Sequence, residues 1–126
     1  MKPAIELNEL AAGIGRYLRM NRSVIMREDR IHDGIASALD DLGFEADREY
    51  RLSEQSRLDF FLPDTGTAIE VKKGAVALPV LHQVGRYFES PRVTGCILVA
   101  MRIHPKVPTS FAGKPIAQVP LWKYLL

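Results

Sequence analysis

Residues 57–72, with the sequence RLDFFLPDTGTAIEVK, constrain the fold of this chain more than any other stretch. Two β-prone runs, 58–62 and 67–72, flank the four residues 63–66, PDTG. Proline presets φ for the first position of a turn, aspartate bonds its own backbone, and glycine adopts a positive φ without strain. The stretch therefore predicts a β-hairpin.

The turn also sets the register of this hairpin. Leu62 opposes Thr67, and counting back from that pair places Asp59 opposite Glu70. Two carboxylates then face each other with Cβ atoms roughly 5 Å apart, which is destabilising unless a cation lies between them. Lys72 follows Glu70 on the same face but can pair with only one of the two acids. The arrangement therefore suggests a bound cation that the side chains themselves do not supply.

The alternation of side chains along the two strands predicts one charged face and one apolar face. Arg57 and Lys72 join the two acids on the charged face. The face expected to pack on the core carries Leu58, Phe60, Ile69 and Val71. A slip by one residue would bury every charge, so we expect a firm register.

The composition is that of an ordinary soluble domain. A chain of 126 residues, 47% hydrophobic and 25% charged, is long enough for one domain with its own core. The only cysteine, Cys96, excludes an internal disulfide and favours a reducing compartment. Because no apolar run is long enough to span a membrane and the N-terminus lacks a signal-peptide core, we expect a cytoplasmic protein with no membrane partner.

The charge distribution says more than the net charge of +2. From residue 91 to the end there is no acidic residue, and the basic ones are Arg92, Arg102, Lys106, Lys114 and Lys123. A positive surface beside a carboxylate cluster would suit a polyanion that is met by a metal ion. A solvated basic face explains the same pattern equally well.

Apolar residues at helical spacing predict three helices, at residues 4–20, 24–42 and 78–88. We expect the first to pack on the core, with dimerisation or a contact to a phosphate backbone as alternatives. A first strand is predicted at 44–53. The continuous apolar run 94–101 predicts a strand buried on both faces, which a parallel crossover would join to the hairpin.

The remaining segments complete the predicted fold. Residues 102–114 are expected to be a loop, 116–121 an edge strand, and 122–126 an apolar tail that docks on the body. Together the elements predict an α/β fold (α+β by some schemes) with a mixed central β-sheet of about four to five strands flanked by helices.

Glu28 is the one acidic residue that continues the buried stripe of the second helix, because it lies three residues before Ile31. A carboxylate there needs a partner, which taken alone would be a nearby arginine. His32 lies one turn beyond Glu28 on the same side. Such a histidine is more often hydrogen-bonded within the structure than a ligand, and we expect that role.

The order of these elements resembles the PD-(D/E)xK nuclease superfamily across residues 24–101. Asp59 matches the motif aspartate, and residues 70–72, EVK, match the (D/E)xK element. Glu28 matches the acidic residue that many members carry on the first core helix. Leu58 stands where the motif has its proline, a departure that is frequent in the superfamily.

A second match is to the RecB-like branch of this superfamily. Gln83 and Tyr87 reproduce its Q-x-x-x-Y motif on the helix after the hairpin. The resemblance implies a restriction-endonuclease-like core at residues 24–101 of a single domain. A helical arm at 1–22 would precede this core, and a loop and C-terminal strand at 102–126 would follow it.

The resemblance also implies the roles of the site residues. The expected ligands of Mg²⁺ or Mn²⁺ are Asp59, Glu70 and Glu28 together with the backbone carbonyl of Val71. Lys72 would hold the attacking water or the scissile phosphate, and Gln83 and Tyr87 would orient the substrate backbone or the lysine. The candidate phosphate contacts are Arg57, Lys73 and Arg86.

The function expected from these roles is metal-dependent hydrolysis of DNA phosphodiester bonds, with RNA as an alternative substrate. A non-catalytic nucleic-acid-binding or assembly subunit on the same fold is the second hypothesis. The third is a subunit that is active only as a homo-oligomer or with a helicase or recombination partner. Read without the resemblance, Asp59, Glu70 and Lys72 could form a surface ion-pair ladder, and Gln83 and Tyr87 a helix-surface pair.

Overall fold

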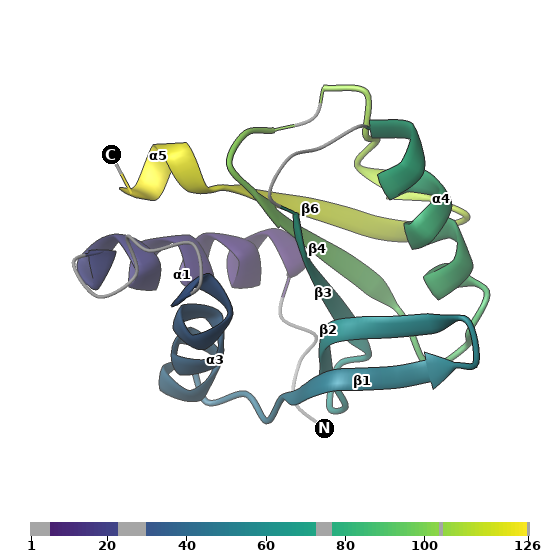
Figure 1. Ribbon diagram of the computed structural model, residues 1–126, viewed down its shortest axis with the longest axis horizontal. Coiled ribbons are helices and arrows are strands. Elements are labelled where there is room, and N and C mark those ends of the chain that lie inside the picture. The colour runs from purple at the N-terminus through teal and green to yellow at the C-terminus, as the bar shows by residue number, and fades with distance from the viewer. Residues whose placement is uncertain (1–5, 23–29, 73–76, 104, 126) are drawn as a thin grey trace.

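Six strands form one mixed sheet in the order β1-β2-β3-β4-β6-β5, and helices cover both of its faces (Figure 1). The computed structural model describes residues 6–22, 30–72, 77–103 and 105–125. The strands are β1 (Asp47–Ser53), β2 (Ser56–Leu62), β3 (Thr67–Lys72), β4 (Gly95–Ala100), β5 (Ser110–Phe111) and β6 (Lys114–Pro120). The helices are α1 (Leu7–Met20), α3 (Ile31–Asp41), α4 (Ala77–Phe88) and α5 (Leu121–Leu125). None of the described helices is long and apolar enough to cross a membrane.

The sheet has an antiparallel half and a parallel half. β1, β2 and β3 form an antiparallel meander, whereas β3, β4 and β6 run parallel. Because α4 connects β3 to β4, the predicted parallel crossover is confirmed. β4 is buried at every position, as expected for a strand covered on both faces.

The hairpin between β2 and β3 has the predicted register at its turn. Leu62 pairs with Thr67 and Phe60 with Ile69. Gly66 has a φ of 77° and donates to Leu62 O at 2.8 Å, which closes the turn. A Cβ at Gly66 would lie 2.6 Å from the Arg92 carbonyl oxygen, so glycine is required by space as well as by φ.

Two hydrophobic cores lie on opposite faces of the sheet. The α1/α3 core includes Phe60 and Ile69, and the α4 core includes Phe61, Ala68 and Leu58. The prediction of a charged second face for the hairpin is therefore wrong, because α4 and its apolar residues cover that face. Leu58 also lies on the face opposite to the predicted one, away from Phe60.

The strand count and several boundaries differ from the sequence-based expectation. The mixed α/β class with flanking helices is confirmed, but the sheet has six strands. β5 lies inside the predicted loop and pairs Phe111 with Lys114, so β6 is not an edge strand. The two residues between them, Ala112 and Gly113, have φ angles of 52° and 80° and form a tight hairpin turn. β1 begins only at Asp47, not at residue 44.

The two ends of the described chain pack against each other. Leu10, Ile14 and Leu18 of α1 are buried in the α1/α3 core, which confirms the expected packing of this helix. The ring of Tyr124 in α5 lies where a Cβ of Gly15 would come within 2.4 Å of its Cζ. The predicted docking of the C-terminal tail is thus confirmed, and the start of the second predicted helix, residues 23–29, lies outside the described part.

Candidate functional site

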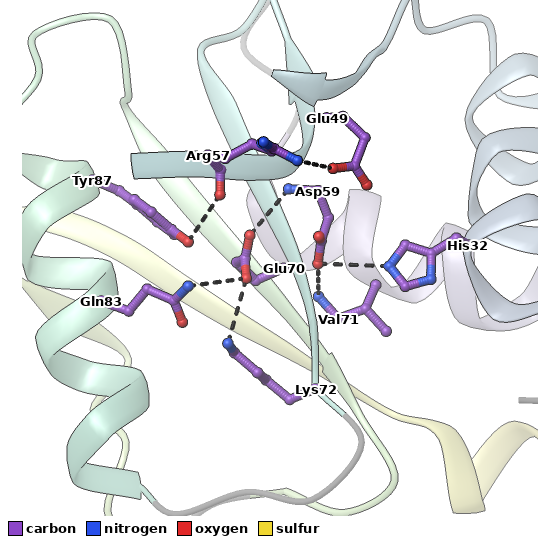
Figure 2. A network of polar contacts seen from close by, with 9 residues as sticks. All are labelled: His32, Glu49, Arg57, Asp59, Glu70, Val71, Lys72, Gln83 and Tyr87. Atoms are coloured by element: carbon purple, nitrogen blue, oxygen red, sulfur yellow. Dashed lines mark hydrogen bonds and ion pairs between the residues drawn. The ribbon is translucent and has the colours of Figure 1, made fainter. Parts of the chain in front are cut away.

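The site lies where β2 and β3 leave their regular ladder. The regular backbone pairing extends from the turn to Phe60 and Ile69, and Asp59 and Glu70 come next on the two strands. Asp59 N donates to Glu70 Oε1 at 3.0 Å, and Val71 N donates to Asp59 Oδ2 at 2.8 Å (Figure 2). Each acid therefore accepts a hydrogen bond from the other's strand, and the two carboxyl groups brace the strands where the ladder ends.

Beside Asp59, the side chains of β1 switch from one face of the sheet to the other. The Arg48 guanidinium lies 5.6 Å from the centroid of the Phe60 ring, in the α1/α3 core, whereas the Tyr50 ring stacks on Phe61 on the α4 side. Residues two apart in a regular strand share a face, so β1 turns over between these two side chains. The residue at the reversal is Glu49, with a φ of 54° that is uncommon outside glycine.

β2 turns over at the matching point. Leu58 and Phe60 lie in different cores although they are two residues apart. The pairs on either side of the reversal are Tyr50 with Leu58 and Arg48 with Phe60. Asp59 therefore lies opposite Glu49, at the point where the two-stranded ribbon reverses, and its carboxylate reaches sideways to the backbone of β3.

Glu70 is the most buried charged group of the site. Its relative exposure is 4%, and its Oε2 lies 3.5 Å from Lys72 Nζ and 3.4 Å from Gln83 Nε2. Burial, and after it the negative charge of Asp59, raise the pKa of Glu70 to about 7. The hydrogen bond from Asp59 N and the charge of Lys72 lower the pKa by less.

Tyr87 closes the α4 side of the site. Its buried hydroxyl donates to Arg57 O at 3.4 Å and also interacts with Glu70. Burial and the charge of Glu70 raise the pKa of the Tyr87 phenol above its ordinary value, so the group acts as a donor and not as a base. α4 positions Gln83 and Tyr87 on one side because the two residues are four apart.

Asp59 is more accessible than Glu70 and faces a different helix. The Asp59 side chain is 23% exposed, and His32 Nε2 of α3 lies 3.8 Å from its Oδ2, too far for a hydrogen bond. The His32 ring stacks on Phe60. The sequence pointed to His32 only through its spacing from Glu28, and Glu49 carried no signal at all.

The remaining predicted residues lie at the margin of this group or outside the described chain. Arg57 Nη1 pairs with Glu49 Oε2 at 3.2 Å on the surface, and Arg86 is exposed on α4. Glu28 and Lys73 fall in segments that the structure does not describe. The structure thus brings together Asp59, Glu70, Lys72, Gln83 and Tyr87, with the Val71 amide hydrogen-bonded to Asp59.

Metal binding can be judged only from the described residues. Among them no group of three or more His, Cys, Asp or Glu side chains is arranged to hold a metal ion. Asp59 and Glu70 offer two carboxylates, and Mg²⁺ commonly takes one or two carboxylates together with waters and substrate phosphate oxygens. Two oxygen donors whose like charges raise the pKa of Glu70 fit a hard divalent cation.

Comparisons of this chain with protein-family models, with curated proteins and with solved structures gave no match. The chemistry of the site is therefore the guide to function. Its distinguishing features are a buried acid, a second acid joined to it through the backbone, and a lysine within reach of one of them.

Proposed function

We propose that this protein is a divalent-metal-dependent nuclease of the PD-(D/E)xK type that hydrolyses DNA phosphodiester bonds. The observation that carries the proposal is the interlocked pair of Asp59 and Glu70 with Lys72 beside it. The order of elements around the pair, a hairpin followed by a helix and a parallel strand, supports the proposal.

The two acids are the proposed ligands of Mg²⁺ or Mn²⁺. The Asp59 carboxylate is held by Val71 N and the Glu70 carboxylate by Asp59 N and Gln83, so both have fixed positions. Asp59 is also partly open to solvent. Glu28 and the Val71 carbonyl remain further candidate ligands. A divalent ion bound there would supply an activated water and offset the charge that develops on the phosphate.

The other side chains of the group have roles in positioning. Lys72 is 27% exposed, so its ammonium can donate to a phosphate oxygen or to the attacking water while staying near Glu70. Gln83 holds the Glu70 carboxylate from α4, and Tyr87 holds the backbone of β2 at Arg57. Arg86, exposed on α4, and Arg57 and Lys73 are the candidate contacts to flanking phosphates.

The first test is cleavage of single- and double-stranded DNA, and of RNA, with Mg²⁺ or Mn²⁺. We expect DNA cleavage that is abolished by chelation and reduced at least about a hundredfold in Lys72→Ala, the effect of losing one charge-stabilising donor. Arg19→Ala removes an exposed basic residue from α1, away from the site, and should retain activity. Absence of cleavage on every substrate and at every metal concentration, or full activity of Lys72→Ala, would contradict the proposal.

A non-catalytic nucleic-acid-binding or assembly subunit is the second candidate, and one observation favours it. Both carboxyl groups already accept backbone hydrogen bonds, so they could serve only to brace β2 against β3. This candidate predicts that DNA is retained in the presence of a chelator and is never cleaved with Mn²⁺. Activity that appears only after a helicase or recombination partner, or a second copy, is added would identify a subunit that depends on its assembly.

A further inference from the structure

Exposed apolar side chains occur in the three segments that follow the parallel strands along the chain. Lys72 of β3, Ala100 of β4 and Pro120 of β6 lie in one row of the sheet. The elements or segments that follow these strands in the described chain carry exposed apolar residues, at the start of α4, after β4 and in α5. We call these residues the carboxyl rim: Leu78, Met101, Ile103 and Trp122, which are 61%, 46%, 54% and 43% exposed.

The carboxyl rim is unlike the rest of the described surface. It accounts for four of the seven large hydrophobic residues that are exposed in the described chain. Single exposed apolar side chains need no explanation, but a group at the end of three adjacent strands indicates a binding surface. Ligands of sheets with parallel strands commonly bind beyond the carboxyl ends of those strands.

α5 presents its tryptophan outward. Leu121 is buried and Tyr124, three residues later on the same side of the helix, packs on Gly15 of α1, so the side that carries Trp122 and Lys123 faces away from the body. Trp122 N donates to Met101 O at 3.0 Å, which joins the start of α5 to the chain after β4. Because neighbouring strands are about 4.8 Å apart, the end of β6 lies about 10 Å from Lys72.

The charged residues in the chain from β4 to α5 are all basic. Arg102, Lys106 and Lys123 are exposed, and no acidic residue occurs from residue 91 to the end of the chain. The other two basic residues of this segment are used within the fold, since Arg92 donates to Leu52 O at 2.7 Å and Lys114 to Phe88 O at 2.9 Å. The exposed Arg102, Lys106 and Lys123 thus lie near rim residues in the sequence, and Lys123 Nζ also lies 5.7 Å from the centroid of the Tyr124 ring.

We propose that the carboxyl rim binds single-stranded DNA and leads it to the acids and Lys72. Unpaired bases expose apolar faces that stack on an aromatic ring, whereas the faces of paired bases are hidden inside the duplex. In this arrangement a base stacks on Trp122, neighbouring bases pack on Met101 and Ile103, and Arg102 and Lys123 contact phosphates. The inference deepens the proposed nuclease function by naming its substrate, and it rests on that function for the cleavage of the bound strand.

Trp122 is the only tryptophan in the chain, so its fluorescence reports on the carboxyl rim directly. The test is to titrate oligothymidylate, and separately a duplex of equal length, into the intact protein in EDTA, which prevents cleavage. We expect saturable quenching of Trp122 by the single strand and little by the duplex. Quenching that is equal for both, or absent, would overturn the proposal.

Variants separate stacking from a general loss of structure. Trp122→Ala should weaken binding of a labelled oligothymidylate about tenfold, as expected when one base loses its aromatic partner, and Trp122→Phe should recover most of that loss. Phe111→Ala removes an aromatic residue of similar exposure, 39%, at the opposite end of β6 and should bind like the wild type. Equal weakening in the Phe111 and Trp122 variants would contradict the assignment.

Three further outcomes distinguish this inference from others. A change in Trp122 emission with protein concentration and without DNA, together with a dimer in sedimentation, would show that a second copy covers the rim and would overturn the proposal. DNA cleavage without quenching would contradict DNA binding at the rim but would support the nuclease function. Saturable quenching without cleavage would support the rim and contradict the nuclease function.

Discussion

Glu70 shows how a single residue connects the fold of this protein to its chemistry. Its carboxyl group is buried beside a second acid, and both circumstances favour the protonated form and raise its pKa to about 7. The folded chain therefore binds this proton more tightly than the unfolded chain does. The corresponding contribution to stability is complete below the ordinary glutamate pKa of 4.5 and is lost as the pH rises through about 7.

The raised pKa of this residue predicts a pH dependence of stability. Between pH 5 and pH 8 the free energy of unfolding of the metal-free protein should fall, by a term on the order of 3 kcal/mol from Glu70. Glu70→Gln keeps an oxygen that can accept from Asp59 N but has no charge, so its free energy of unfolding should lack this term. Urea denaturation in EDTA across the pH range measures both, with the exposed Glu45→Gln as the control. If the free energy of unfolding of the wild type and of Glu70→Gln changed with pH in the same way, the pKa of Glu70 would not be raised in the folded protein, and the prediction would be wrong.

At the scale of elements, the paired reversal in β1 and β2 positions Asp59. Glu49 has a positive φ of 54° and lies directly opposite Asp59. On one side of this pair Phe60 packs in the α1/α3 core, and on the other side Leu58 packs in the α4 core. A residue with a side chain adopts such a φ at a cost of about 1–2 kcal/mol. The reversal lets the Asp59 carboxylate reach the β3 backbone, and we infer that the Glu49 backbone helps to set the site.

Substitutions at Glu49 test this role. Glu49→Gly permits the same φ and loses only an exposed ion pair with Arg57, so stability and cleavage should stay close to wild type. Glu49→Val should lower the free energy of unfolding by about 1–2 kcal/mol and reduce cleavage, because a β-branched residue resists this φ. Ala112→Val meets a φ of 52° in the turn between β5 and β6 and should cost similar stability without loss of activity. Equal activity losses in both valine variants would refute the positioning role.

The elements also show what the sequence can predict and where its signals end. The PDTG turn determined the register of β2 and β3, and the unbroken apolar run of β4 indicated burial on both faces. β1 carries polar and charged residues on both sides and is mostly exposed, so no periodicity marked the reversal at Glu49. β5 has only two residues and turns through Ala112 and Gly113, a weaker signal than Asn-Gly.

The same signals explain which of the predicted site residues lie together in the structure. The grouping of Asp59, Glu70, Lys72, Gln83 and Tyr87 results from the hairpin register and from helical spacing. The burial of Glu70 and the contact of His32 with Asp59 depend on how α4 and α3 cover the sheet, which strand periodicity does not specify. The charged face was mispredicted because alternate positions of β2 and β3, such as Phe61 and Ala68, are apolar on both faces.

On the scale of the whole molecule, the mixed sheet has an antiparallel half and a parallel half. The acids lie on the antiparallel pair β2 and β3. The parallel strands β3, β4 and β6 end side by side at Lys72, Ala100 and Pro120. α1 and α5, from opposite ends of the described chain, pack together and fix the last of these ends. The site and the carboxyl rim therefore depend on contacts that are distant in the sequence.

A substitution in α1 tests this long-range packing. Gly15→Ala would place a Cβ 2.4 Å from the Tyr124 ring, so we expect the free energy of unfolding to fall by about 1–3 kcal/mol. Gly13→Ala meets the flexible side chains of Leu42, at 3.3 Å, and Arg16, at 3.9 Å, and should be neutral or stabilising by up to about 1 kcal/mol because alanine favours the helix. Urea denaturation of the two variants compares them, and equal effects would show that α5 does not pack on α1 as described.

The most direct test of the central claim is the anomalous scattering of Mn²⁺ in crystals of this protein. The claim is that Asp59 and Glu70 bind one divalent cation and that Lys72 holds the attacking water or a phosphate oxygen beside it. It predicts an anomalous peak within coordination distance of a carboxylate oxygen of both acids, and loss of that peak in Asp59→Asn. A saturating soak that leaves this position empty, or that places Mn²⁺ only elsewhere, would contradict the claim.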